Sequence, residues 1–181
     1  RFALHILPSG IFYPHITNVI GNGVALDIQK LSDELESIVS QGVPAPRLIV
    51  SDRAQLLLPY HVLQDTYEEA RLGGKAFGST KSGIAPFYSD KYAKTGIQVC
   101  DLFDEKILWE RLSAAVELKN VLFEHLYHKP KLDARELMDQ LLVLREKIRP
   151  YVGDTVAFVH QALKEGKTIL LEGQLGSMKD P

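Results

Sequence analysis

The stretch from Gly73 to Gly96 gathers more anion-binding side chains than any other part of the sequence. Glycines let backbone N–H groups come close to a ligand, while ammonium and hydroxyl groups contact its oxygens. The candidates are Lys75, Ser79, Thr80, Lys81, Ser82, Lys91 and Lys94. This composition is typical of a phosphate-binding loop. It also fits a second interpretation, in which the lysines only keep a solvent-exposed loop soluble.

The triplet Gly166-Lys167-Thr168 resembles the end of a nucleotide-binding P-loop, but its context differs. That motif needs a glycine five positions before Gly166, where Gln161 stands, and it follows a strand and opens a helix. Here a predicted helix ends and a predicted strand begins. We therefore interpret Gly166 as a helix stop.

Histidines and acidic residues elsewhere are weaker candidates. His125 and His128 lie three positions apart on a predicted helix and could approach one metal ion, but the sequence indicates no third ligand. Asp52 follows a predicted strand at its carboxyl end, where α/β sheets often bind ligands, although an ion pair or a turn cap fits as well. Three further histidines stand alone and are interpreted as packing or hydrogen-bonding residues: His5, His15 and His61.

Composition excludes several classes of protein. The formal net charge is -2, from 21 basic and 23 acidic side chains, so no overall field attracts nucleic acid or an anionic membrane. No apolar run reaches the roughly 20 residues of a membrane-spanning helix. Cys100 is the only cysteine, which rules out an intrachain disulfide and suits a reducing cytosol. We expect a cytoplasmic protein that binds neither nucleic acid nor membrane.

Strands and helices alternate in the expected organisation. Short β-branched runs predict strands over residues 2–7, 16–26 with a break at Gly21-Asn22-Gly23, 47–50 and 168–171. Apolar residues at helical spacing predict helices over 28–39, 59–72, about 108–126, 137–148 and 153–166. Asp27 and Asp133 are suitable N-caps, and Gly42 is a suitable stop. The fold class is therefore α/β, with a mostly parallel central sheet flanked by helices and a helical insertion.

Several longer strings, taken in order, are similar to one enzyme family. They are FALHILPSGI from Phe2, IGNGV from Ile20, SDRAQLLLPYH from Ser51, FGSTKSGIAPFYSDKYAKTGI from Phe77 and LLEGQLG from Leu170. The fourth resembles the Gly-Thr-Thr-Gly-Arg-Gly-Ile-Gly-Pro loop of the adenylosuccinate synthetases. Because the strings keep the family's order and spacing over all 181 residues, the chain resembles a piece of such an enzyme.

The resemblance implies an activity that the chain would share in only as a part. The family uses GTP and Mg2+ to join aspartate to inosine monophosphate (IMP) in purine biosynthesis. Its catalytic Asp and His lie upstream of the position that matches Arg1, and its aspartate- and guanine-binding parts lie downstream of Pro181. We expect residues 1–181 to form a single partial domain without catalytic residues of its own, inactive in isolation. It would contain a nucleotide-phosphate loop at 73–100 and a mainly helical subregion at 104–166.

Specific site residues follow from the same resemblance. Thr80 matches the threonine that contacts the 5′-phosphate of IMP. Lys94 matches an arginine that reaches this phosphate from the neighbouring subunit, which implies a homodimer. Lys91 and Ser79 are expected to support the loop. Gln174 and Leu175 stand where the family's nucleotide-binding glutamine is expected.

Departures from the family pattern leave the purine open. Lys81, Ser82 and Ala85 replace a glycine, an arginine and a glycine, and the usual Glu-Gly-Ala-Gln-Gly reads Glu-Gly-Gln-Leu-Gly at 172–176. One alternative is a related synthetase that acts on another purine nucleotide, such as a guanylate. The other is a non-catalytic nucleotide-binding or dimerisation module.

Overall fold

A small parallel sheet forms the centre of the molecule in the computed structural model, which describes residues 2–76 and 78–173. Strands β1 (Asn18–Ile20), β3 (Leu48–Ser51) and β5 (Val152–Gly153) lie in the order β1-β3-β5, all parallel. Strands β2 (Ala25–Leu26) and β4 (Gln55–Leu56) form a second parallel pair. Parallel neighbours require crossover connections, and a helix supplies the first of them. The predicted α/β class is confirmed.

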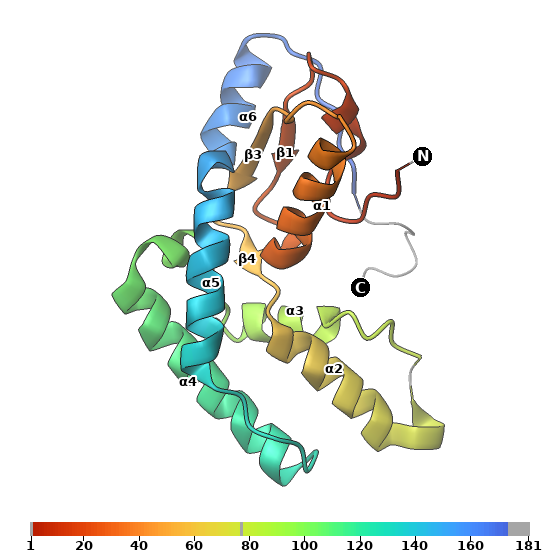
Figure 1. Cartoon of the computed structure of the whole chain (residues 1–181), viewed down its shortest axis with the longest axis vertical. Helices are drawn as coiled ribbons and strands as arrows, with labels where there is room; N and C mark the ends of the chain where they lie inside the picture. Colours follow the sequence, from red (N-terminus) through yellow and green to blue (C-terminus); the bar gives the residue numbers. More distant parts are fainter. Residues whose placement is uncertain (1, 77, 174–181) are drawn as a thin grey trace.

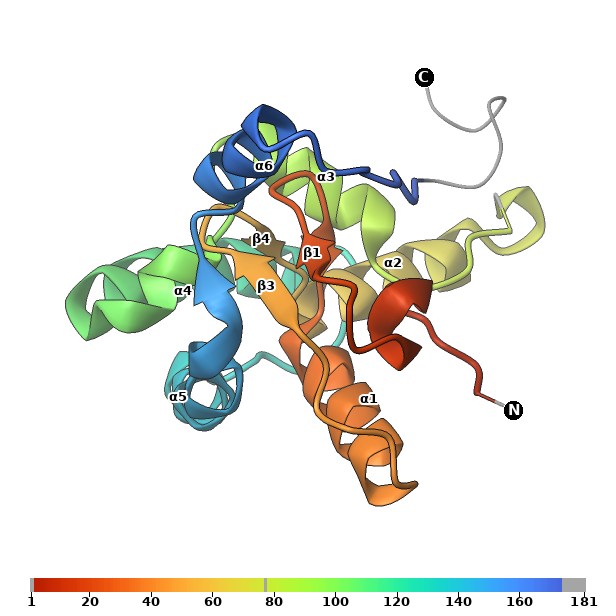
Figure 2. The same ribbon diagram turned by 90° about the horizontal axis from the view of Figure 1, so that it is seen from above.

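Six α-helices surround or extend this sheet. They are α1 (Ile28–Ser40), α2 (Pro59–Leu72), α3 (Ile84–Tyr92), α4 (Glu105–His125), α5 (Ala134–Ile148) and α6 (Thr155–Lys164). Short 3-10 turns cover Ser9–Phe12, Gly73–Lys75, Val99–Phe103 and Arg149–Tyr151. In Figure 1 the sheet lies with α1 and α6 at one end, while α2, α3 and α4 form a helical region at the other. Figure 2 shows α1 and α5 on one side of the sheet and α6 on the opposite side.

The helix boundaries follow the local signals in the sequence. Asp27 caps α1 by accepting the Lys30 N–H, and Asp133 caps α5 by accepting the N–H groups of Arg135 and Glu136. Helix α6 ends at Gly166 with φ +69°, where the N–H of Gly166 donates to Leu163 and the next N–H donates to Ala162. This pairing is the usual glycine-terminated helix end, so the interpretation of Gly166 as a stop is confirmed.

One continuous apolar core joins the sheet to the helical region. Its fully buried members include Leu26, Leu31, Val50, Leu108, Leu112, Phe123 and Ile148. Burying such a side chain is worth about 1.5–3 kcal/mol. Because residues from α1, β3, α4 and α5 share this core, the helical region is packed against the sheet as one body.

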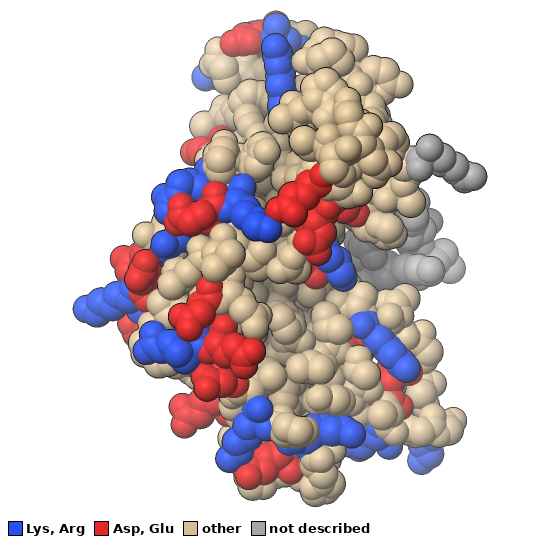
Figure 3. All heavy atoms as spheres, viewed as in Figure 1, with Lys and Arg blue, Asp and Glu red and all other residues tan. Residues whose placement is uncertain are grey.

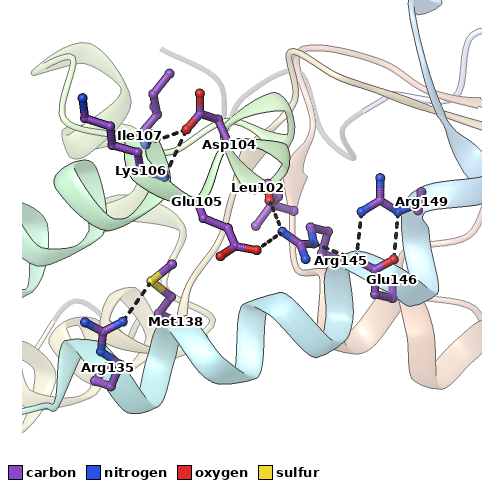
Figure 4. Close-up of polar contacts among 10 residues, drawn as sticks. All are labelled: Leu102, Asp104, Glu105, Lys106, Ile107, Arg135, Met138, Arg145, Glu146 and Arg149. Carbon is purple, nitrogen blue, oxygen red and sulfur yellow. Dashed lines mark hydrogen bonds and ion pairs between the residues drawn. The ribbon is translucent and has the colours of Figure 1, made fainter.

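Arg145 of α5 fastens this helix to the turn before α4 and to the start of α4. Figure 4 shows Arg145 donating from Nη1 to the carbonyl of Leu102 at 3.3 Å and to Glu105 at 3.1 Å. Arg149 and Arg145 both donate hydrogen bonds to Glu146. These bonds, of which the one from Arg149 has the larger effect, lower the pKa of the Glu146 carboxyl to about 2. The junction of α4 and α5 is thus held by polar contacts as well as by the core.

Three expectations from the sequence are wrong. Residues 2–7 form no strand, because the N–H groups of His5, Ile6 and Leu7 donate to the carboxylate of Glu34 on α1. Residues 168–171 also form no strand; Leu170 is 86% exposed and has no ladder partner among the described residues. The stretch from 73 to 96 is not loop throughout, because it contains α3.

Candidate phosphate-binding site

The buried face of α2 is polar. Its buried residues are Tyr60, His61, Asp65 and Glu69, and the last three follow one another at intervals of four. Residues four apart lie on the same side of a helix, so these three form one stripe. Buried ionisable groups need hydrogen-bond partners. The partners in this case come from the following loop and from α3.

Asp65 and Glu69 bind the start of the loop. Asp65 accepts the hydroxyl of Ser79 through Oδ1 at 2.7 Å and the N–H of Gly83 through Oδ2 at 2.9 Å. Glu69 accepts the N–H of Gly78 at 3.2 Å. Two carboxylates of one helix therefore hold both ends of the segment 78–83.

The same segment packs directly on the backbone of α2. Gly83 has φ +81°, and a Cβ there would lie 2.7 Å from the backbone nitrogen of Val62. No side chain fits this position. Gly78 and Lys81 also have positive φ, at +75° and +56°. Lys81 thus has a left-handed backbone conformation, which glycine adopts more readily than lysine.

Hydroxyl groups of the loop lie close together. Thr80 is exposed, and its Oγ1 lies 2.7 Å from Oγ of Ser82. The N–H of Lys81 donates to Oγ of Ser79 at 3.0 Å, so Ser79 links the exposed tip to Asp65. Hydroxyls and an exposed ammonium group on a pinned backbone are suited to binding phosphate oxygens. Of the predicted residues, Ser79, Thr80, Lys81 and Ser82 are brought together.

Lys91 and Lys94 lie at the far end of α3. This helix has 9 residues, and at about 1.5 Å per residue its ends are separated by about 13 Å. Thr80 precedes the first residue of this helix, whereas Lys94 follows its last, and no contact joins the two residues in the described part of the chain. Lys91 places Nζ 5.5 Å from the ring centre of Tyr88, whereas Lys94 is exposed and follows the helix end with φ +62°.

A buried cluster of charge lies beneath the end of α3. Asp90 accepts Nζ of Lys119 at 2.7 Å and contacts Nε2 of His61 at 3.0 Å. Lys119, on α4, also donates to Oε1 of Gln64 at 2.9 Å. The side chains of His61, Asp90 and Lys119 are only 2%, 9% and 5% exposed. The cluster thus joins α2, α3 and α4.

Geometry determines the protonation of His61. Its Nδ1 accepts the N–H of Leu58 at 3.0 Å, so the ring hydrogen is on Nε2 and donates to Asp90. Burial lowers the pKa of His61 by more than the hydrogen bond to Asp90 raises it, which keeps the ring neutral. Burial alone would raise the pKa of Asp90, but hydrogen bonds from His61 and Lys119 outweigh it and the pKa is lowered. Asp90 and Lys119 are therefore the ion pair, with His61 as a neutral donor.

A hollow of about 300 Å³ opens beside this cluster, between the end of α3 and α4. Its lining includes Lys94, Thr95 and Arg111, with Asp90 and Lys119 at its inner side. The lining also includes Glu110, so the exposed Lys94 borders a recess of mixed charge that it shares with Arg111, Glu110 and the buried ion pair. Arg111 is itself held 3.5 Å from Asp101.

The sequence analysis missed the stripe on α2 and its partner Asp90. His61 is a hydrogen-bonding residue, as interpreted, but it does not stand alone. The available signal was the spacing of His61, Asp65 and Glu69, which places three ionisable side chains on one helical face next to Tyr60. Apart from Tyr60, which belongs to the apolar core, the buried positions of α2 are ionisable and bind polar groups of the neighbouring elements.

The other candidates make contacts outside this loop. Asp52 accepts the Cys100 N–H through its carbonyl, and the N–H of Arg53 donates to Oγ of Ser51, so the strand end is a turn. His125 contacts Glu124 at 3.4 Å. Within residues 2–76 and 78–173, no three His, Cys, Asp or Glu side chains are grouped as a metal site would require. Gln174 and Leu175 lie outside the described residues.

Surface charge is mixed in sign. Figure 3 shows acidic and basic side chains interspersed over the face formed by α4 and α5. Ion pairs account for several of them, such as Lys131 with Glu124 at 2.8 Å. In the part of the chain that the structure describes, no helix has the length and apolar character needed to cross a membrane.

The comparisons with known proteins all indicate the same family. The family model of adenylosuccinate synthetase matches residues 1–181. The chain is 42% identical to the adenylosuccinate synthetase of Caldicellulosiruptor saccharolyticus over 179 residues, and 44% identical to that of Mycobacterium avium over 180 residues. In both cases the alignment covers 99% of this chain and 42% of the relative.

A solved structure has the same fold. The fully ligated adenylosuccinate synthetase from Plasmodium falciparum superposes with a TM-score of 0.85 at 29% identity, over 99% of this chain and 41% of that one. The chain thus spans well under half the length of the relatives it matches. With a family model matching every residue, the chain belongs to the adenylosuccinate synthetase family.

Proposed function

We propose that this chain supplies the phosphate-binding part of an IMP site in a longer enzyme that joins aspartate to IMP with GTP. Family membership supports the reaction, and the pinned loop supports the part that the chain plays in it. The observation that carries the proposal is the segment 78–83, where exposed Thr80 is held on a backbone fixed by Asp65 and Glu69.

The proposed reaction has two steps. The γ-phosphoryl group of GTP is transferred to the 6-oxygen of IMP, and the amino group of aspartate then displaces that phosphate and forms the new C–N bond. Catalysis of such a transfer is mainly positioning and charge stabilisation. The loop holds the opposite end of the nucleotide, so its contribution is to orient IMP.

Each residue of the loop has a distinct proposed role. Thr80 donates its hydroxyl to the 5′-phosphate. Ser79 transmits the support of Asp65 to the loop tip, and Lys91 adds positive charge in the last turn of α3. Lys94 lies at the opposite end of α3 from Thr80 and serves the IMP site of the neighbouring subunit in a homodimer. This division agrees with the separation of about 13 Å expected between the two ends of that helix.

GTP and Mg2+ belong to the proposed reaction, but we assign neither to residues of this chain. Magnesium prefers carboxylate oxygens and phosphates, and the described residues contain no suitable group of acidic side chains. When bound, Mg2+ supplies charge neutralisation on the transferred phosphoryl group. We propose that other parts of the enzyme hold both, that the isolated chain is inactive, and that the enzyme is cytoplasmic.

Calorimetric titration of IMP into the enzyme that contains this chain tests the loop. Thr80→Val removes one hydroxyl and should weaken binding about tenfold, the usual effect of losing a hydrogen bond to a charged group. Thr66→Val is the matched control, because that hydroxyl donates only to Val62 within α2 in this structure. Equal affinities for all three proteins would refute the role of Thr80. Tighter binding of guanosine monophosphate than of IMP would refute the assignment of the purine.

A further inference from the structure

The end of α3 has an unusual conformation. The N–H of Thr95 donates to the carbonyl of Asp90 at 3.0 Å, and the N–H of Lys94 donates to that of Lys91 at 3.2 Å. This is the pairing of a Schellman helix end, in which the left-handed residue is usually glycine. Here that residue is Lys94, with φ +62°. A left-handed lysine is strained, and such strain persists only where the surroundings enforce it.

Asp90 connects this helix end to two other helices. Its carbonyl accepts the Thr95 N–H and, at 3.3 Å, the Thr95 hydroxyl. Its carboxylate binds His61 of α2 and Lys119 of α4. The residue that receives the final hydrogen bond of α3 is therefore also the residue that is fixed to both neighbours.

Stability alone does not explain the cluster. A buried ion pair loses hydration energy that its attraction barely restores, so apolar residues of the same size are often as stable. What the pair does provide is geometry, because Lys119 and His61 bind different oxygens of the Asp90 carboxylate, at 2.7 and 3.0 Å. This arrangement sets the end of α3 and the direction in which Lys94 leaves it.

We propose that Asp90, held by His61 and Lys119, is the positioning residue for Lys94. The inference rests on the proposed role of Lys94 at the IMP phosphate of the neighbouring subunit. The hollow beside Lys94 and Arg111 is the space into which that phosphate end would enter. The buried cluster thus determines how well one subunit completes the site of the other.

A double-mutant cycle on the enzyme that contains this chain tests the proposal. Asp90→Asn combined with Lys119→Met removes the ion pair without leaving a buried charge unpaired. Combining this pair of changes with Lys94→Ala gives the cycle, and the readouts are KM for IMP and kcat. Glu124→Gln with Lys131→Met is the matched control, because it makes the same kinds of change in an exposed ion pair.

We expect Lys94→Ala to raise KM about tenfold with kcat nearly unchanged. The variant removes a charged contact to IMP that is made equally in the ground state and in the transition state. The charge-free pair, Asp90→Asn with Lys119→Met, should raise KM at least about threefold on its own. In the Lys94→Ala background it should change KM little, because the effects of coupled residues are not additive. The control pair should leave KM unchanged. If the charge-free pair does not fold, Lys119→Gln, which keeps a donor toward Asp90, enters the same cycle.

Two results would overturn the inference, and they are distinguishable. Additive effects, or no effect of the charge-free pair while Lys94→Ala raises KM, would show that Asp90 does not act through Lys94. An unchanged KM in Lys94→Ala would refute the proposed role of Lys94 itself and would leave Asp90 nothing to position.

Discussion

Replacing Lys94 by glycine should make the protein more stable and its nucleotide binding weaker. Lys94 has φ +62° at the left-handed position of a helix end, where a Cβ atom costs about 1–2 kcal/mol. Glycine removes that cost, but its greater conformational freedom stabilises the unfolded chain by about 0.4–1 kcal/mol. The side chain is exposed, so little packing is lost. The net gain in the free energy of unfolding should be about 0.5–1 kcal/mol.

Lys94→Ala separates the two effects. Alanine removes the charge and keeps the Cβ, so it should weaken IMP binding as much as glycine does without the gain in stability. Urea unfolding of the three proteins gives the free energies, and calorimetric titration of IMP gives the affinities. A glycine variant no more stable than the alanine variant would refute the argument that Lys94 is strained. Full affinity in both variants would refute its role in binding.

Three further predictions concern α2 and its partners. Gly83→Ala should lower the free energy of unfolding by about 2 kcal/mol or more, because its Cβ would lie 2.7 Å from the Val62 nitrogen at φ +81°. Asp65→Ala should cost about 1–3 kcal/mol by leaving the Gly83 N–H buried without its acceptor, and should weaken IMP binding as well. Urea unfolding measures the free energy of unfolding of both variants. A change below about 0.5 kcal/mol, the range of ordinary surface substitutions, would contradict the prediction for that variant. His61 should make the protein less stable in mild acid. Folding lowers the pKa of His61 from 6.5, so the unfolded chain binds the proton at a higher pH than the folded protein does. The free energy of unfolding is therefore highest above about pH 6.5 and falls by up to about 1.4 kcal/mol for each pH unit below that value. Asp90, whose pKa is lowered from 3.8, adds a further loss as the pH falls below that value. His61→Gln should flatten the profile between pH 7 and 5, and an unchanged slope would show that His61 does not titrate there.

Local signals in the sequence determined most of the helices. Caps such as Asp27 and Asp133, the stop at Gly166 and the apolar periodicities act within a few residues, because a helix satisfies its own hydrogen bonds four residues away. The strand predicted at 47–50 was also found, as β3, since the short apolar run Leu48-Ile49-Val50 is typical of a buried strand in a parallel sheet. The prediction of an anion-binding loop around Thr80 came from residue types alone.

Tertiary contacts decided the remainder. Residues 2–7 and 168–171 have the composition of strands, but a strand exists only with a partner, and Glu34 takes the N–H groups of the first segment. Helix α3 escaped notice because its buried face includes Asp90, which counts as polar in any periodicity.

The positions of the site residues were likewise invisible in the sequence. His61, Asp90 and Lys119 are distant along the chain, and only packing of α2, α3 and α4 joins them. The left-handed conformation of Lys94 was not predictable either, because a lysine by itself disfavours it. The sequence by itself determined which hydroxyl and ammonium groups were available as candidate phosphate ligands, and the tertiary structure decided which of them lie close together on a fixed backbone.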